Sequence, residues 1–289
     1  MVTAVVLVVG VATLLGLLDR VFWVLETADV FRLQYLVLLL AAALAALMLR
    51  RSRLAFVAVV LAAVNAVVMG IPVAATATAV GARPKGSLRV LVTNVEVGNT
   101  DFAAVDRLVA QSRPDVLGVI ELTPPMARHL HAALPLYRVR ILEVRGDAYG
   151  IGVYSRLPLL SAKIARFPAD GPPTVVARVR VAGKPVAVVV THVHTTFAGS
   201  IHVRHLDALA AAARSQLGKR VVVCGDFNTP PWSGPLRNFE ADAHVRDLEH
   251  PEDTVQKAKQ RRQPDNENNS GGDASTAAHY SKPQHAWTF

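Results

Sequence analysis

The sequence has little charge, few aromatic side chains and a single cysteine. Charged residues make up 18% of the 289 residues and aromatic residues 6%, whereas 52% are hydrophobic. One cysteine, Cys224, excludes a disulfide framework within the chain and any zinc or iron–sulfur site built from several thiolates. The composition also excludes a disordered or fibrous chain, and it differs from that of ordinary soluble proteins. The net charge of +9 fits nucleic acid, an anionic membrane surface or a phosphate-bearing substrate.

Charge is absent altogether from three long runs, residues 2–18, 33–49 and 54–80. A helix of about 17 residues spans about 25 Å, close to the hydrocarbon thickness of a bilayer. We therefore predict a membrane domain over residues 1–80 with three transmembrane helices, at about 2–18, 33–49 and 54–75. Buried core helices are the alternative, although such helices usually carry a polar face. A cleaved signal peptide is the alternative for the first run, but no Lys or Arg precedes that run.

Arginines in the short loops predict how these helices would be oriented. The loop after the second run reads Arg50-Arg51-Ser52-Arg53, and short loops rich in positive charge are cytoplasmic. The loop over residues 19–32 mixes arginines with acidic residues instead. Three crossings then place the chain after about residue 82 outside. We expect a multi-pass protein of the cell membrane, in contact with the lipid bilayer, whose soluble part is extracytoplasmic.

After a linker at residues 81–87, short valine-rich runs alternate with helical segments over residues 88–250. This pattern is typical of a layered α/β (α+β) domain. The tail over residues 251–289 is polar and aperiodic, which predicts a disordered segment. The expected strands cover residues 88–93, 116–120, 137–144, 150–154, 174–181, 185–190 and 221–224, and the expected helices cover 102–111, 124–133 and 203–217.

Polar side chains follow four of the expected strands within one or two residues. Asn94, Glu121, His192 and Asp226 take these positions, and Asn228 comes two residues later. Ligands of layered α/β proteins collect outside strand ends, where rigid sheet edges fix the side chains. Carboxylates hold Mg²⁺ together with water and substrate phosphate, and a histidine can donate to a phosphoryl or leaving-group oxygen. Each residue alone fits an ordinary turn or surface position, but their repetition favours a site for metal-assisted phosphoester hydrolysis.

Short motifs surround these residues in a consistent order: Thr93-Asn94-Val95, Val119-Ile120-Glu121-Leu122, Gly152-Val153-Tyr154-Ser155-Arg156, Thr191-His192 and Gly225-Asp226-Phe227-Asn228. The set resembles the endonuclease/exonuclease/phosphatase superfamily, which includes deoxyribonuclease I, apurinic endonucleases, inositol-phosphate phosphatases and neutral sphingomyelinases. It resembles in particular the bacterial type with three N-terminal membrane helices. The resemblance covers about residues 1–250.

This resemblance implies a fold, an activity and a role for each residue. The fold would be a four-layer α/β sandwich of the deoxyribonuclease I type, with the site at one rim. Glu121 would be the principal ligand of Mg²⁺ or Mn²⁺, with Asn94 and Asp226 close to the metal and water. His192 would stabilise the phosphoryl group or protonate the leaving oxygen, and Asn228 would orient the nucleophile and the substrate. The implied activity is that of a membrane-anchored, Mg²⁺-dependent phosphoesterase.

The C-terminal part departs from the pattern of that superfamily. Members end with two more strands and a Ser-Asp-His-type motif, whose His-Asp pair acts on the attacking water, and nothing of that kind follows Trp232. We expect no strand after about residue 250, and a truncated or frame-shifted product is one explanation. Four histidines remain as replacements for the missing base, but none follows an expected strand: His244, His250, His279 and His285.

Two other hypotheses remain open. In the first, loss of the Asp-His pair leaves an inactive, truncated membrane protein whose domain only binds a phosphorylated or lipid ligand. In the second, the pairs His192-x-His194 and His202-x-x-His205 form a zinc site. The three-residue spacing puts His202 and His205 on one face at the start of a helix, which more often indicates surface capping residues.

Basic residues do not select one substrate. Arg138, Arg140 and Arg145 could line an anionic groove, but an alternating basic strand is usually a solvated face. Nucleic acid, phospholipid and small phosphoesters all remain candidate substrates.

Overall fold

The computed structural model describes residues 1–70, 87–216, 220–245 and 277–280. The chain divides into two compact units. The first unit comprises Met1–Ala79 together with His194–Leu206 and Asn228–Phe239, and the second comprises the remainder. The two later segments of the first unit were not expected, and the expected domain bounds stay a prediction. Nearly all of the expected linker, and most of the expected disordered tail, lie outside the described residues.

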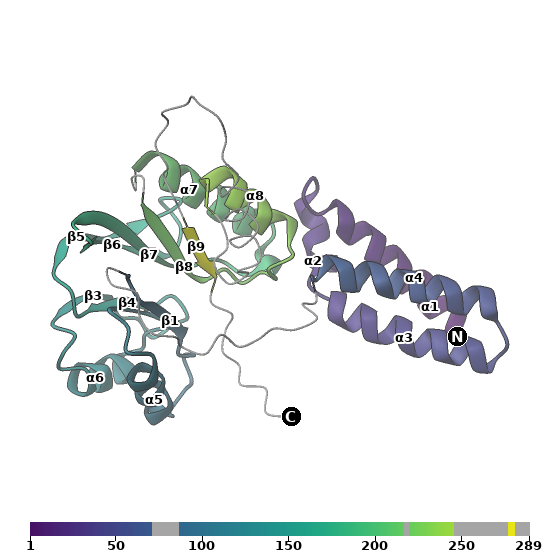
Figure 1. Ribbon diagram of the computed structural model, residues 1–289, viewed down its shortest axis with the longest axis horizontal. Helices are drawn as coiled ribbons and strands as arrows, with labels where there is room; N and C mark the ends of the chain where they lie inside the picture. The colour runs from purple at the N-terminus through teal and green to yellow at the C-terminus, as the bar shows by residue number, and fades with distance from the viewer. Residues whose placement is uncertain (71–86, 217–219, 246–276, 281–289) are drawn as a thin grey trace, which may run out of the picture. The chain divides into compact units, whose positions relative to one another are not determined.

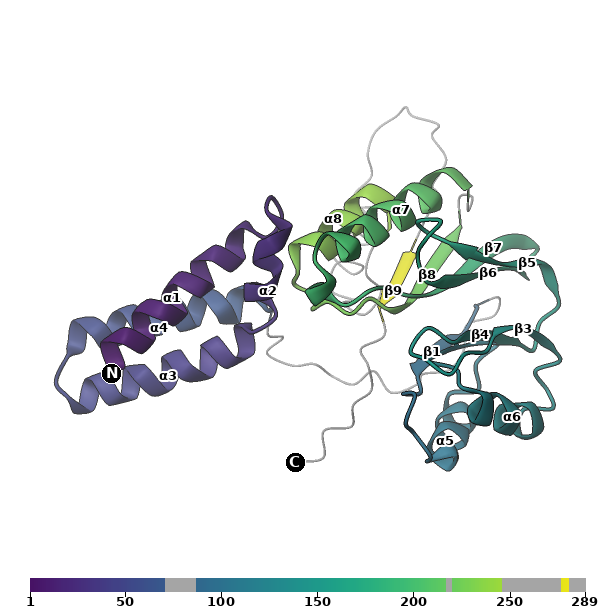
Figure 2. The same ribbon diagram turned by 180° about the vertical axis from the view of Figure 1, so that it is seen from behind.

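Three apolar helices, lying side by side in Figures 1 and 2, dominate the first unit: α1 (Val2–Leu15), α3 (Arg32–Met48) and α4 (Ser52–Val68). Between α1 and α3 lie the short helices η1 (Gly16–Leu18), η2 (Trp23–Leu25) and α2 (Glu26–Asp29). Small side chains such as Ala42, Ala46 and Ala58 are buried between the long helices. Large apolar side chains such as Leu44 and Phe56 point outward and are 62 and 69% exposed. Helices of soluble proteins usually bury their apolar face instead.

No single helix in the described part of the chain is long and apolar enough by itself to cross a membrane. The pair Trp23–Asp29 and Arg32–Met48 reaches the required length and composition together, with a bend of 51° between its members. The expectation of three spanning helices therefore stays a prediction.

A line of polar contacts joins the three long helices of the first unit. Arg32 at the start of α3 contacts Asp29 of α2 and donates from Nη1 to Asn65 Oδ1 of α4 at 3.3 Å. Asn65 Nδ2 donates in turn to Thr13 Oγ1 of α1 at 2.9 Å. All four residues are 0–1% exposed. Buried polar groups are costly unless they are hydrogen-bonded, and this line satisfies them within an otherwise apolar bundle.

The second unit contains two β-sheets that face each other (Figures 1 and 2). The order of the first sheet is β1-β2-β4-β3, and that of the second is β5-β6-β7-β8-β9. The strands are β1 (Val90–Asn94), β2 (Val116–Ile120), β3 (Val139–Glu143), β4 (Ile151–Ser155), β5 (Leu159–Arg166), β6 (Pro173–Val181), β7 (Lys184–His192), β8 (Val221–Asp226) and β9 (Ala277–Tyr280).

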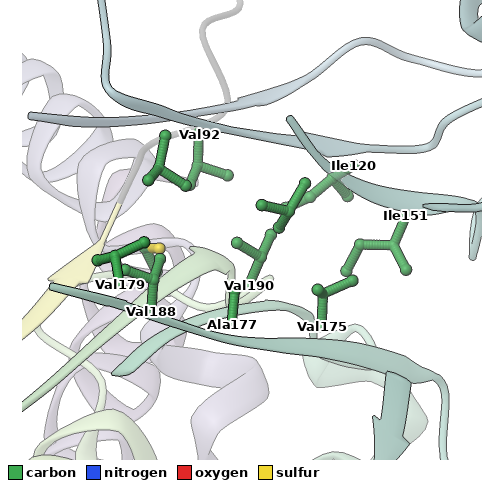
Figure 3. Close-up of a cluster of buried hydrophobic side chains, with 11 residues drawn as sticks. Val92, Ile120, Ile151, Val175, Ala177, Val179, Val188 and Val190 are labelled. Carbon is green, nitrogen blue, oxygen red and sulfur yellow. The ribbon is translucent and has the colours of Figure 1, made fainter. Parts of the chain in front are cut away.

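The main core fills the space between the two sheets (Figure 3). Val92, Ile120 and Ile151 of the first sheet pack against side chains of the second sheet such as Val175 and Val190. Apolar residues on the inner faces follow the two-residue period of a strand, and the valine-rich runs of the sequence supply them. Burial of these side chains stabilises the fold by about 25 cal/mol for each Å² of apolar area removed from water.

Helices cover the outer faces of both sheets. Helices α5 (Phe102–Ser112) and α6 (Pro124–Ala133) pack on the first sheet, burying Val105 and Leu130. Asp101 caps α5, because its Oδ1 accepts from the Ala104 amide at 3.0 Å. Within the second unit, the C-terminal half of α7 (Ser200–Gln216) buries Leu209 and Ala210. The expected two-sheet α/β sandwich is therefore confirmed.

Among the strands and the helices of ten or more residues, three were not expected from the sequence: β5, α8 (Gly234–Ala243) and β9. The expectation of no strand after residue 250 is wrong for Ala277–Tyr280, which pairs in parallel with β8. The physical reason lies in β8, whose second edge offers unpaired backbone groups that a short segment without apolar alternation can satisfy.

Candidate active site

Strand pairing brings four of the five predicted site residues to one end of the two sheets. Strands β1 and β2 are parallel and pair Asn94 with Ile120, so Glu121 follows directly beside Asn94. Strands β7 and β8 are also parallel and pair His192 with Asp226. Because the carboxyl ends of parallel strands meet at the same sheet edge, residues far apart in the chain become neighbours.

The Asn94 amide connects the two carboxylates of this site. Its Nδ2 donates to Glu121 Oε1 at 2.7 Å and to Asp226 Oδ2 at 3.0 Å. Its Oδ1 accepts from the Glu96 amide at 3.0 Å, which fixes which way the side-chain amide points. Asn94 and Glu121 are half-buried, and Asp226 is buried. One amide group thus holds a carboxylate of each sheet at short range.

Glu121 is held by its backbone as well as by Asn94. Its φ of 59° lies in the left-handed region, which is uncommon for a residue with a Cβ. Its Oε2 accepts from the Val97 amide at 3.0 Å. Both carboxylate oxygens therefore have a donor, one from the last residue of β1 and one from the segment that follows it, and the Glu121 side chain is fixed at the end of β2.

The ring of His192 is oriented by the backbone. Its Nδ1 lies 2.8 Å from the Ala148 carbonyl oxygen, and because a carbonyl only accepts, Nδ1 carries a proton. Its Nε2 lies 3.9 Å from Asp226 Oδ2, and the Tyr149 ring lies 5.7 Å from the His192 ring. The imidazole is 5% exposed. Nε2 is therefore the nitrogen that faces the Asp226 carboxylate.

Gly225 permits the close approach of β8 to β7 immediately before Asp226. A Cβ at this position would lie 1.9 Å from the carbonyl oxygen of Thr191. No side chain fits there, so the glycine of the Gly-Asp-Phe-Asn motif is needed to place Asp226 opposite His192.

Asn228, the fifth predicted residue, belongs to the first unit. It also has a left-handed backbone, with φ 52°. Its carbonyl oxygen accepts from Thr196 Oγ1 at 2.8 Å and from the Thr196 amide at 3.4 Å. Its role with the other four residues remains a prediction, supported by its place two residues after Asp226.

The donor set fits a hard divalent cation. Glu121 and Asp226 present carboxylate oxygens to the same amide group, and one or two carboxylates together with water and substrate phosphate are the usual ligands of Mg²⁺. In the described residues, no group of three or more His, Cys, Asp and Glu side chains could hold a metal ion. The site thus fits a cation that takes its other ligands from water and substrate.

The zinc hypothesis is wrong for the described histidines. His202 and His205 are fully buried, not surface residues as expected. Their Nδ1 atoms face the backbone of His194: His202 Nδ1 lies 2.5 Å from its carbonyl oxygen, and His205 Nδ1 accepts from its amide at 3.4 Å. His192 binds Ala148 instead. These histidines fix a loop rather than converge on an ion.

Of the four C-terminal histidines considered as replacements for a base, two lie in described parts of the chain. His244 is exposed and has φ 54°. His279 lies in β9, where its backbone pairs with Cys224. His250 and His285 lie outside the described residues.

Comparison with solved structures finds similar folds at low identity. Sphingomyelinase C from Streptomyces griseocarneus is 20% identical, with a TM-score of 0.47, over 57% of this chain and 71% of that one. Humanized D. rerio TDP2 with 14 mutations is 18% identical, with a TM-score of 0.47, over 54 and 67%. An endonuclease/exonuclease/phosphatase from Beutenbergia cavernae is 20% identical, with a TM-score of 0.42, over 55 and 54%.

Sequence comparison assigns the family. No curated protein matches the chain. A family model described as the Endonuclease/Exonuclease/phosphatase family matches residues 91–288, which include both sheets apart from Val90 and all five predicted site residues. The chain therefore belongs to the endonuclease/exonuclease/phosphatase family.

Proposed function

We propose that this protein is a membrane-anchored, Mg²⁺-dependent phosphoesterase whose site lies outside the cytoplasm. One observation carries the proposal: the Asn94 amide joins Glu121 and Asp226, and Asp226 in turn faces His192 Nε2. Two carboxylates and an imidazole at the ends of parallel strands form a set suited to phosphoester hydrolysis. Membership of the family supports the same reaction class.

The residues divide the chemistry between them. Glu121 and Asp226 would hold Mg²⁺, which when bound neutralises charge on the phosphoryl oxygens and activates water. Asn94 keeps the two carboxylates in place. Because His192 Nδ1 already donates to Ala148, only its Nε2 can donate a proton to a phosphoryl or leaving-group oxygen. Asn228 would orient the attacking water and the substrate.

The outward-facing side chains of the first unit support the membrane anchor. Leu7, Leu44 and Phe56 lie on different helices and are each more than 60% exposed. Exposing such side chains to water is unfavourable, by about 25 cal/mol per Å² of apolar surface, and contact with lipid removes that cost. Small residues between the helices, such as Ala46 and Ala58, are typical of helices packed in membranes.

Hydrolysis assays on the full chain in detergent test the activity. Substrates of three kinds are compared: bis-p-nitrophenyl phosphate and DNA, phospholipid and sphingomyelin, and p-nitrophenyl phosphate. We expect turnover that requires Mg²⁺ or Mn²⁺ and that falls about 10²–10⁴-fold in Glu121→Ala and Asp226→Ala.

Asp106→Asn is the matched control, because Asp106 pairs with His129 on the helices over the first sheet. Absence of metal-dependent turnover with every substrate, combined with retained binding of phosphate or lipid, would instead support the inactive binding domain.

Paired reporter fusions test the anchor and its orientation. Alkaline phosphatase, which is active only outside the cytoplasm, and green fluorescent protein, which folds inside, are fused in turn after residue 250. We expect phosphatase activity without fluorescence. Fusions in the loop at Arg51 should give the opposite pattern, and a cytoplasmic signal from the C-terminal fusion would overturn the proposed location.

A further inference from the structure

Three carboxylates between α1 and α3 are buried. Asp19, Glu26 and Asp29 are 1, 2 and 1% exposed, and a buried charge is costly unless it is paired and hydrogen-bonded. Asp29 pairs with Arg32 three residues later. Asp19 and Glu26 have their partners far along the chain, in the two later segments of the first unit.

One of these segments, Asn228–Phe239, begins with the last residue of the Gly-Asp-Phe-Asn motif. Thr229 Oγ1 donates to Glu26 Oε1 and lies 2.8 Å from Ser233 Oγ. The Gly234 amide, at the start of α8, donates to Asp19 Oδ2 at 2.6 Å. Thr229 and Ser233 are 4 and 0% exposed. The N-terminal carboxylates therefore bind the backbone and hydroxyl groups of a buried turn.

The other segment, His194–Leu206, comes shortly after the Thr-His motif. His202 Nε2 lies 3.5 Å from Glu26 Oε1, and His202 Nδ1 contacts the His194 carbonyl. Trp23 packs against Gly199, where a Cβ would lie 2.8 Å from the indole ring. Glu26 thus contacts both segments, one after each motif strand.

These two segments also hold each other at Asn228. Thr196 of the segment His194–Leu206 donates to the Asn228 carbonyl oxygen at 2.8 Å. Thr229, which follows Asn228 in the chain, donates to Glu26. Asn228 has φ 52°, a conformation that needs support from its surroundings. The chain continues from Asp226 to Asn228 through Phe227 alone.

We propose that Glu26 is a positioning residue for Asn228, the predicted site residue that lies in the first unit. It fixes Thr229 and, through Thr229, the backbone of Asn228. The connection between α1 and α3 therefore contributes to catalysis as well as linking two helices. This inference rests on the proposed function. It assigns no contact between Glu26 and the substrate.

The hydroxyl of Thr229 provides the sharpest test. In the full chain, with Mg²⁺ and bis-p-nitrophenyl phosphate, Thr229→Val and Glu26→Ala should each lower kcat by about 10²-fold, the typical effect of a misplaced group. KM should change less than threefold, because Glu121, Asp226 and His192 are left in place and only Asn228 is displaced. Thr229→Ser keeps the hydroxyl and should retain kcat within about threefold. A purely structural role would lower the melting temperature without this selective rescue.

Arg20→Ala is the matched control. The Arg20 side chain lies in the same connection and contacts Asn238 at 3.4 Å in an exposed position, so kcat should be unchanged. If Glu26→Ala fails to fold, the Thr229→Val and Thr229→Ser pair decides. An active wild type with unchanged kcat in Thr229→Val overturns this inference and leaves the proposed function intact. A wild type without metal-dependent turnover overturns both.

Discussion

His192 and Asp226 are paired residues of two adjacent parallel strands, and the 3.9 Å between His192 Nε2 and Asp226 Oδ2 follows from that pairing. We expect His192→Ala to lower kcat about 10²–10⁴-fold, because the ring nitrogen that faces Asp226 is lost. The measurement is steady-state hydrolysis with saturating Mg²⁺. His129→Ala is the matched control, since His129 also faces an aspartate, Asp106, but does so on the outer helices. Equal losses in both variants would contradict the assignment.

Replacing the Asn94 amide by a carboxylate should couple stability to divalent cations. Asn94→Asp removes the donor shared by Glu121 and Asp226 and adds a like charge beside them. Without a cation we expect the free energy of unfolding to fall by about 1–3 kcal/mol. Mg²⁺ should raise the melting temperature of the variant more than that of the wild type. Thermal denaturation with Mg²⁺ and with EDTA measures this difference. Asn99→Asp, in an exposed turn, should show neither effect.

Gly225 should tolerate no side chain. Gly225→Ala places a Cβ 1.9 Å from a backbone oxygen of β7, and β7 or β8 would have to move. We expect a loss of more than about 4 kcal/mol, seen in urea denaturation or as failure to fold. Gly146→Ala, which would meet no atom within 4 Å, should change stability by less than about 0.5 kcal/mol. Similar curves for the two variants would refute the close approach.

Cys224 should report global unfolding of the second unit. The thiol is 1% exposed, and burial raises its pKa to about 12. Because the thiolate is the reactive form, the folded protein should not react with a thiol reagent at pH 8, whereas the unfolded chain should react at once. A urea series with iodoacetamide and mass spectrometry measures this. Rapid labelling without urea would show that β8 is accessible.

Removal of β9 should weaken the second sheet. A chain ending at Val245 exposes the backbone edge of β8 that Ala277–Tyr280 covers. We expect a melting temperature lower by about 4 °C or more and aggregation that depends on concentration. A chain lacking only residues 281–289 keeps β9 and should behave as the full chain. Identical melting of both truncated chains would argue against this pairing.

The sequence predicts best where local pattern and tertiary role agree. Strand β2 is buried throughout, and its apolar run marks its bounds at residues 116–120. Strand β5 was missed because its residues are mostly exposed and it lacks the valine-rich run that marks the other strands. Helix α8 was missed because it begins at Gly234 and Pro235, two residues that disfavour helix, although Leu236, Phe239 and Ala243 follow a helical spacing and are buried. Strand β9 depends on the distant edge of β8, which no local pattern reveals.

The same distinction applies to the site. Parallel strands align their ends, so Asn94, Glu121, His192 and Asp226 could be grouped from their positions after strands alone. Burial of His202 could not be predicted, because its partner Glu26 comes from a segment near the other end of the chain. Local sequence around His202 indicates only a helix start. A single sequence does not indicate which polar residues far apart in the chain will contact each other.

The polar line from Arg32 through Asn65 to Thr13 has a consequence for how the first unit assembles. Smooth apolar helices can slide and rotate against one another at little cost, since one aliphatic contact resembles the next. Directional hydrogen bonds are satisfied in one arrangement only. A leucine at position 65 would make the bundle more apolar and yet allow several packings. The few polar side chains of this bundle therefore select one arrangement of its helices, whereas the many apolar side chains make it hydrophobic.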